Sequence, residues 1–263
     1  MTAGADGDMR AEKVMTLVEH LSELRRRIFV SLLAIAAGGI VGYYLAPDVI
    51  NVLRAPVGQP LVTFTLTGSF LIRLKLSLMI GLALASPVVL YQLWAFISPG
   101  LTARERRVAR PWIPLALIFL VLGVGVAYVT LPLTVAFLLS FQLPGIVEPL
   151  ITAESYFGFV TTLFLVFGLV MQFPIVLVLL SKVGIVTVER LRRGRRHVFV
   201  GIFILAVVVT PGGDPFSPTI MAAVMYPLYE LTIWLVARST RRKKAEEADV
   251  TDDAEDAGEG GTE

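Results

Sequence analysis

Long apolar runs separated by short polar loops recur along this chain, and they constrain its fold more than any other feature. A helix needs about 20 apolar residues to cross the hydrocarbon core of a bilayer. Of the 263 residues, 56% are hydrophobic and only 17% are charged, whereas about a quarter of the residues of a soluble domain are charged. The sequence therefore predicts an all-α integral membrane protein with six spans, at about 28–46, 70–97, 112–131 (continuing toward 139), 154–180, 198–209 and 216–237.

Prolines and one short run set the expected shapes of these spans. We expect Pro47 and Asp48 to end the first span, and Pro87 to bend the second. The fifth run has only twelve residues, which make about 18 Å of helix against a hydrocarbon core of about 30 Å. The last two spans should therefore form a short hairpin in a locally thinned bilayer. The alternation at 61–66 is typical of a short extended segment.

The basic residues lie almost entirely on one side of the predicted membrane. Twenty Lys or Arg residues fall in the N-terminal segment, the second loop, the fourth loop and the C-terminal segment. Three fall on the opposite side: Arg54, Arg73 and Lys75. Because cytoplasmic loops carry an excess of Lys and Arg, we expect both termini to be cytoplasmic.

Both ends of the chain are polar. Residues 1–14 are expected to be disordered, and residues 15–238 to form the six-span domain. Residues 239–263 should form a disordered tail, first basic and then acidic, whose basic part lies near anionic lipids.

Most catalytic and metal-binding chemistry is excluded by residue usage. The chain has no cysteine and two histidines, His20 and His197, neither with a second histidine at ligand spacing. The spans contain no Ser–His pair, paired aspartates or HExxH motif, and the chain has no Walker-type glycine loop. These absences argue against an intramembrane protease, ATP hydrolysis by a Walker-type loop and a cysteine or histidine metal site. We also expect no enzyme activity, no cofactor and no nucleic-acid partner.

Two carboxylates on the cytoplasmic side have alternative interpretations. Glu23 has the spacing of an exposed ion pair with Arg27, which contributes a few tenths of a kcal/mol, and Glu105 lies among arginines as a solvated charge. Alternatively, both face one groove and bind a basic partner segment, because each carboxylate can bind a guanidinium through two hydrogen bonds.

Three further polar residues interrupt or border the later spans. Gln172 either makes an interhelix hydrogen bond or is a docking point for a polar side chain of another membrane helix. Glu230 either pairs with Arg238 or a tail lysine at the cytoplasmic interface, or is the coupling carboxylate of a small-solute secondary transporter. Asp214, in the turn that starts at Thr210, should cap the last helix.

Several of these segments together resemble the TatC family, the core membrane component of the twin-arginine protein translocase. The resemblance covers about residues 15–238. It rests on HLSELR at 20–25, SPVVLYQLWAFISP at 86–99 with RERR at 104–107, FGLVMQFP at 167–174 and TPGGD at 210–214.

The resemblance implies a non-enzymatic receptor for folded cargo proteins whose signal peptides carry paired arginines. It implies a six-helix concave, glove-like bundle in the cytoplasmic membrane of a prokaryote, with transport driven by the proton-motive force. TatA- and TatB-type single-span partners and self-association are also implied. The implied signal-peptide site comprises Glu23, Arg25, Phe96, Leu101, Glu105 and Arg106.

The chain departs from the family pattern at two places. Many members have glutamate where this chain has Gln172, which can accept hydrogen bonds but cannot pair as an anion or carry a proton. Pro218 replaces a polar residue that is common in the family. Pro56, Thr210 and Asp214 are expected to shape the extracytoplasmic caps.

Overall fold

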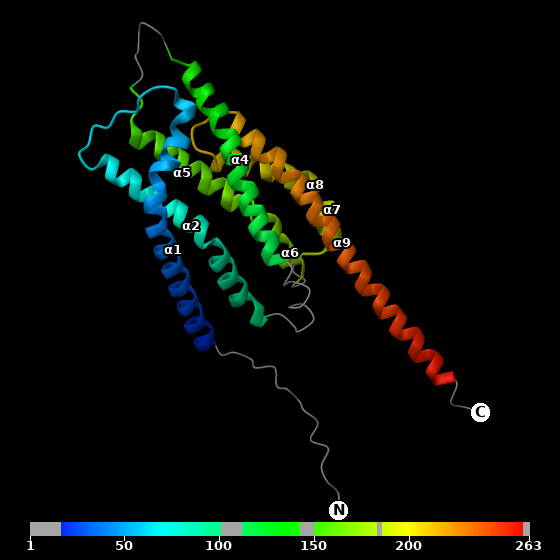
Figure 1. Cartoon of the computed structure of the whole chain (residues 1–263). Helices are drawn as coiled ribbons and strands as arrows, with labels where there is room; N and C mark the ends of the chain where they lie inside the picture. Colours follow the sequence, from blue (N-terminus) through cyan, green and yellow to red (C-terminus); the bar gives the residue numbers. More distant parts are fainter. Residues whose placement is uncertain (1–16, 101–111, 143–149, 183–185, 260–263) are drawn as a thin grey trace, which may run out of the picture.

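The computed structural model describes residues 17–100, 112–142, 150–182 and 186–259, and these residues form a bundle of helices (Figure 1). Within them, the only β-structure is one isolated bridge. The helices are α1 (Leu17–Arg54), η1 (Ala55–Val57), α2 (Gly68–Ile97), η2 (Ser98–Gly100), α4 (Trp112–Ser140), α5 (Ala153–Val170), α6 (Phe173–Lys182), α7 (Val188–Arg193), α8 (Arg195–Val209) and α9 (Phe216–Glu259).

Five helical segments of the described residues are long and apolar enough to cross a membrane. They are Val18–Val57, Gly68–Ile97, Ile113–Ser140, Ala153–Ser181 and Phe216–Arg238. The fifth predicted run forms α8, whose 15 residues make only about 22 Å of helix. The chain is therefore a multi-pass membrane protein, and the shortness predicted for its fifth run is present in α8.

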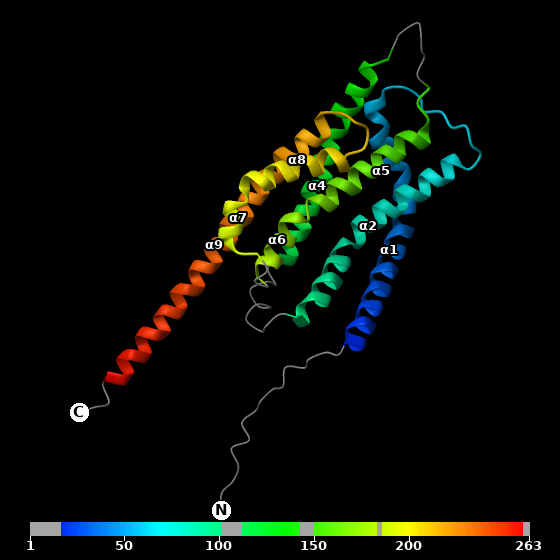
Figure 2. The same cartoon turned by 180° about the vertical axis from the view of Figure 1, so that it is seen from behind.

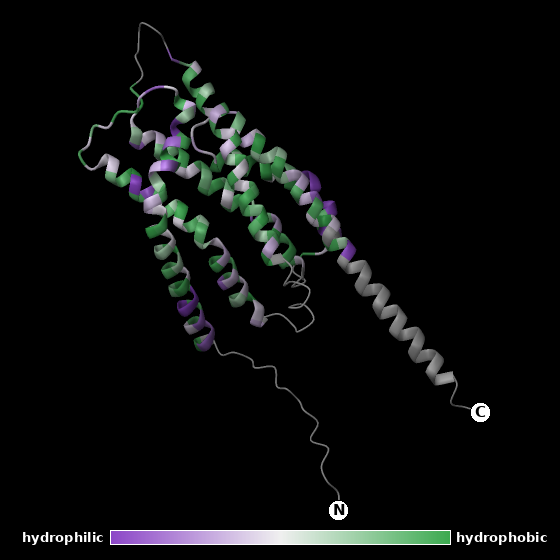
Figure 3. Cartoon of the chain, viewed as in Figure 1, coloured by the Kyte–Doolittle hydropathy of each residue, from purple (hydrophilic) through white to green (hydrophobic). Residues whose placement is uncertain are grey.

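Hydropathy along the helices agrees with this arrangement. Hydrophobic residues dominate the lengths of α1, α2 and α4, while hydrophilic residues gather at the start of α1 and around α7 (Figure 3). Polar ends flanking apolar middles are what a bilayer requires.

The first helix continues through Pro47, so the prediction that Pro47 and Asp48 end it is wrong. A proline inside a helix lacks the N–H that would bond to the carbonyl four residues earlier, which here belongs to Tyr43. Arg73 on α2 supplies the missing donors, with Nη2 at 3.1 Å and Nε at 3.3 Å from the Tyr43 carbonyl oxygen. The Arg73 guanidinium also lies 4.0 Å from the centroid of the Tyr43 ring. The helix survives its proline because a neighbouring helix replaces the lost hydrogen bond.

Glycines bring α1 and α2 into close contact. A Cβ atom added at Gly42 would lie 2.4 Å from the carbonyl oxygen of Ser77, and one at Gly81 would lie 2.5 Å from the nitrogen of Gly39. Small residues at such crossings let membrane helices approach through their backbones. The two helices thus form an antiparallel hairpin, which stands apart from α8 and α9 (Figure 2).

The fourth apolar run is broken into two helices. α5 ends at Val170 and α6 begins at Phe173, so Gln172 lies at the joint and Pro174 in the first turn of α6, where a proline is tolerated. α5 is the central helix of the core, and its Val160, Leu163 and Phe167 side chains are fully buried.

The loop between η1 and α2 is hydrogen-bonded to the segment that leads into α5, at the end of the bundle opposite the start of α1. Val62 donates to the carbonyl of Ile151 at 3.1 Å and accepts from the nitrogen of Ala153 at 2.8 Å. The extended segment expected at 61–66 is limited to a parallel bridge at Val62, because the chain bends at Thr65 and turns at Leu66. Thr65 adds a hydroxyl hydrogen bond to Glu154 at 3.0 Å.

Candidate functional site

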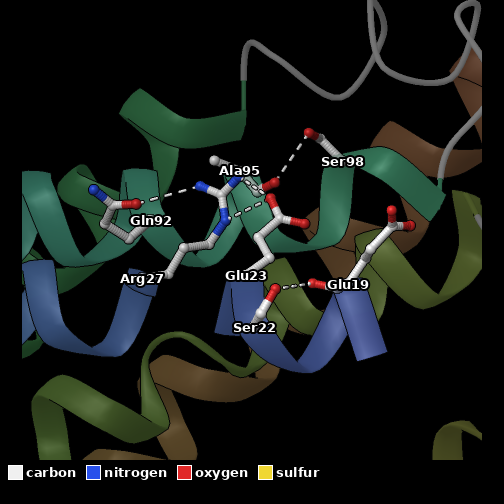
Figure 4. Close-up of polar contacts among 7 residues, drawn as sticks. All are labelled: Glu19, Ser22, Glu23, Arg27, Gln92, Ala95 and Ser98. Atoms are coloured by element: carbon white, nitrogen blue, oxygen red, sulfur yellow. Dashed lines mark hydrogen bonds and ion pairs between the residues drawn. The ribbon is translucent and has the colours of Figure 1, made fainter. Parts of the chain in front are cut away.

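A polar cluster forms where the start of α1 packs against the end of α2 (Figure 4). Arg27 donates through Nε to Glu23 Oε1 at 2.9 Å, and its Nη2 contacts the same oxygen. Its third nitrogen, Nη1, donates to Gln92 Oε1 on α2 at 3.3 Å. The predicted pairing of Glu23 with Arg27 is therefore confirmed, and it extends to Gln92, which sequence reasoning missed.

The environment of this pair differs from the exposed one expected. Only 15% of the Glu23 side chain and 21% of the Arg27 side chain are exposed. Glu23 Oε2 is buried and has no hydrogen-bond partner within the described part of the chain. Because buried carboxylate oxygens almost always accept a hydrogen bond, this oxygen can receive a further donor. A guanidinium N–H is one donor that matches such a carboxylate oxygen.

An aromatic contact borders the cluster. The rings of His20 and Phe96 are stacked, with centroids 4.4 Å apart and planes inclined by 19°. Both side chains are half-buried. Phe96 was expected at the site and His20 was not, although His20 precedes Glu23 by three residues and so shares its face of α1. The pair forms a flat apolar surface beside a polar one.

The remaining predicted site residues fall outside the cluster or outside the described residues. Arg25 is exposed on α1 and is absent from the Glu23–Arg27–Gln92 contacts. Leu101, Glu105 and Arg106 lie beyond the described residues, which stop at Gly100 on this side of the gap. Their roles stay predictions.

A cavity of about 600 Å³ lies in the membrane region between α1, α2, α4 and α5. Its wall is apolar except for Ser86 and Gln172. The Ser86 hydroxyl donates to the Ala83 carbonyl at 2.7 Å, the group that Pro87 leaves without its helical donor. Because the Ser86 hydroxyl is already bonded within its own helix, Gln172 is the polar side chain that distinguishes the wall of this cavity.

Gln172 holds the α5–α6 joint against α4. Its Nε2 donates to the carbonyl of Ala116 at 3.2 Å, so the predicted interhelix hydrogen bond is confirmed. Its Oε1 is buried and accepts no hydrogen bond from the described residues. A donor from outside this chain could bond to it.

Glu230 is paired, although with a different partner from the one expected. Its Oε2 lies 2.8 Å from Nη2 of Arg195 on α8. The predicted pairing with Arg238 is wrong, because the Arg238 guanidinium lies over the Trp234 ring, 5.3 Å from its centroid. Glu230 is 31% exposed and so lacks the buried setting of a coupling carboxylate.

Asp214 caps the last helix, as predicted. Its Oδ1 accepts from the backbone nitrogen of Ser217 at 2.7 Å and from the hydroxyl of Thr134 on α4 at 3.1 Å. Thr210 ends α8 with its hydroxyl bonded to the Ala206 carbonyl at 2.7 Å, and Pro56 begins the short helix η1. Across the described residues, no group of three His, Cys, Asp or Glu side chains could hold a metal ion.

Comparison with known proteins identifies what this arrangement resembles. Residues 19–223 match the family described as "Sec-independent protein translocase protein (TatC)". A relative of that description from Carboxydothermus hydrogenoformans is 37% identical over 228 residues, which cover 85% of this chain and 93% of that protein. The one from Escherichia coli K12 is 34% identical over 233 residues, covering 86% and 90%. A crystal structure described as "Twin Arginine Translocase Receptor- TatC in DDM" superposes with a TM-score of 0.70 at 34% identity, covering 82% of this chain and 99% of that one.

Proposed function

Since this chain belongs to the TatC family of Sec-independent protein translocase proteins, we propose that it is the signal-peptide receptor and core subunit of a twin-arginine translocation system. It is a protein-transport component of the bacterial cytoplasmic membrane. The observation that carries the receptor role is the largely buried Glu23, which has one oxygen occupied by Arg27 and one without a partner in the described chain.

The proposed topology has six spans with both termini in the cytoplasm. α8 and α9 form the last hairpin, and α8 reaches across only where the bilayer is thinned. The distribution of Lys and Arg, twenty against three, supports this orientation. It puts the Glu23 cluster on the cytoplasmic side, where a signal peptide arrives.

In the proposed binding step, an arginine of the signal peptide bonds to Glu23. Oε2 is buried and has no partner in the described chain, so the carboxylate becomes available to the arginine when Arg27 moves away from Oε1. Arg27 keeps the hydrogen bond to Gln92, so its displacement does not leave it without a partner. Glu105 is proposed as the carboxylate that binds the second arginine of the pair.

The rest of the proposed site accommodates the residues around the two arginines. The stacked rings of His20 and Phe96 provide a surface for apolar residues that follow the arginine pair, and Leu101 is proposed to bind the same residues. Arg25 and Arg106 are proposed to bind the polar backbone and any acidic residue that precedes the pair.

The membrane cavity is proposed to receive a helix of a TatA- or TatB-type partner, on the concave face of a glove-like bundle. Its apolar wall suits a membrane helix, and Gln172 Oε1 still has room for a hydrogen-bond donor. Because glutamine is neutral, this docking requires neither an anion nor a proton at position 172. Coupling to the proton-motive force would then involve other groups of the assembled complex.

The decisive experiment compares signal-peptide binding by Glu23→Gln, Glu105→Gln and the double variant in pull-down or crosslinking with the full chain. Loss of a charge-assisted hydrogen bond of about 1.5–3 kcal/mol should weaken binding between about tenfold and a hundredfold for each carboxylate. Glu189→Gln, which removes an exposed charge on α7, is the matched control. Unchanged binding by a normally inserted double variant would refute the assignment. Export of a twin-arginine reporter in cells that lack the native gene tests the function as a whole.

A further inference from the structure

A second cavity, of about 430 Å³, opens where the last apolar span ends. Its wall is formed by Arg192 on α7 and by Trp234, Ala237 and Arg238 on α9. The apolar span of α9 runs from Phe216 to Arg238, so the cavity lies at the polar end of that span. Around α7 the residues change from hydrophobic to hydrophilic (Figure 3), as they do at the depth of lipid headgroups.

The backbone that carries Arg192 is anchored. The Tyr229 hydroxyl on α9 donates to the Leu191 carbonyl at 2.8 Å, and Leu191 and Tyr229 are only 5% and 1% exposed. Arg192, the next residue, therefore extends from a fixed point on the bundle. Its side chain lines the cavity together with residues of α9.

The positive charge at this cavity is not compensated by the residues that line it. Among the residues that the structure describes, none that lines the cavity is acidic. Glu230, on the same helix, is already paired with Arg195 at 2.8 Å. Arg238 contacts the face of the Trp234 ring, an interaction that leaves the guanidinium N–H groups at its edge able to donate.

We propose that this cavity binds the phosphate headgroup of an anionic phospholipid. Two guanidiniums present paired donors that match phosphate oxygens. Trp234 and Leu231 are 54% and 41% exposed and lie three residues apart on α9, so they continue the cavity as an apolar strip along the span. Acyl chains can lie against that strip, whereas a free phosphate ion would use the arginines alone. The inference is independent of the proposed signal-peptide site.

The test measures contact between Trp234 and lipid in the full chain reconstituted into phosphatidylcholine vesicles. The chain has three tryptophans, so Trp94→Phe and Trp112→Phe leave Trp234 as the reporter. Brominated phosphatidylglycerol and brominated phosphatidylcholine, each at the same low fraction, quench indole fluorescence on contact. We expect the brominated anionic lipid to be preferred on the order of tenfold at this site.

Two double variants separate the site from general surface charge. Arg192→Gln with Arg238→Gln should lower the preference to about onefold. Arg26→Gln with Arg196→Gln removes the same charge from exposed arginines outside the cavity and should retain the preference. Equal quenching by both lipids in the parent, or equal loss in both double variants, would overturn the proposal.

A further arm distinguishes lipid from free phosphate. Loss of the preference in millimolar inorganic phosphate would assign the cavity to the free ion and overturn the lipid proposal, and an unchanged preference supports it. If the tryptophan substitutions prevent folding, native mass spectrometry of the chain with all three tryptophans gives the same decision. A retained phosphatidylglycerol adduct should be lost in the Arg192/Arg238 variant and kept in the Arg26/Arg196 control.

Discussion

Arg27 occupies the carboxylate that is proposed to bind an incoming arginine, so removing it should strengthen signal-peptide binding. The pair is largely buried and uses two nitrogens of Arg27, which places it near the upper end of the range for ion pairs that are not fully buried, about 1 kcal/mol. Apparent affinity falls by the fraction of receptor in which the site is free. Arg27→Gln should therefore lower the Kd for a twin-arginine peptide about fivefold.

The assay is fluorescence anisotropy of a labelled twin-arginine signal peptide with the full chain in nanodiscs, at an ionic strength of about 0.15 M. Exposed charges are then screened within about 8 Å. Arg26→Gln removes the same charge from an exposed neighbour that does not contact Glu23, so it measures the general electrostatic contribution. The expected fivefold gain is the ratio of the Kd of Arg26→Gln to the Kd of Arg27→Gln.

A double-mutant cycle isolates the competition. In the Glu23→Gln background, Arg27→Gln should give no gain beyond that of Arg26→Gln, because the contested carboxylate is gone. Weaker binding by Arg27→Gln alone would show that Arg27 orients Glu23 for the peptide instead of competing with it, and the reasoning would be refuted.

Three further predictions concern the scaffold that holds these sites. Arg73→Leu should lower the free energy of unfolding by about 2 kcal/mol by leaving the Tyr43 carbonyl without a donor, and thermal unfolding in detergent should show a much smaller loss in a Pro47→Ala background. Gly42→Ala should lower the free energy of unfolding by about 1–3 kcal/mol, because the added Cβ would lie 2.4 Å from the Ser77 carbonyl oxygen. Gly125→Ala is its control, because a Cβ there meets nothing within 4 Å. Equal stability of the two variants would contradict the close crossing of α1 and α2. Asp214→Ala should destabilise the fold by about 1–2 kcal/mol, and Asp214→Asn should retain the stability of the parent because asparagine can still cap α9. If the asparagine variant is as unstable as the alanine variant in circular-dichroism melts, the cap is not what Asp214 contributes.

Features that depend on local pattern were predictable from the sequence. The apolar runs predicted the helices, since span length follows from bilayer thickness. The pairing of Glu23 with Arg27 and the cap by Asp214 followed from spacings of four and three residues. Each of these depends on contacts between near neighbours in the chain.

Most features that depend on another helix were not predictable, although the hydrogen bond of Gln172 to a neighbouring helix was. In the sequence, Pro47 predicts the end of a helix, because the hydrogen bond from Arg73 to the Tyr43 carbonyl is not visible there. Glu230 is paired with an arginine on α8 and not with one on its own helix. The burial of Glu23 and its link to Gln92 likewise arise from the packing of α1 on α2. Without partner distances, a charged residue on a helix surface looks the same whether it is solvated or enclosed.

The bond between Arg73 and the Tyr43 carbonyl has a consequence for how this sequence can diverge. Proline at position 47 costs less stability where a donor at position 73 already exists, so the order in which the arginine arises first and the proline second avoids that cost. The reverse holds for their loss, because a lineage that discards Arg73 while keeping Pro47 passes through an intermediate that is less stable by about 2 kcal/mol. The two positions should therefore be epistatic, and among relatives of this chain we expect proline at 47 to occur chiefly together with a long hydrogen-bond donor at 73.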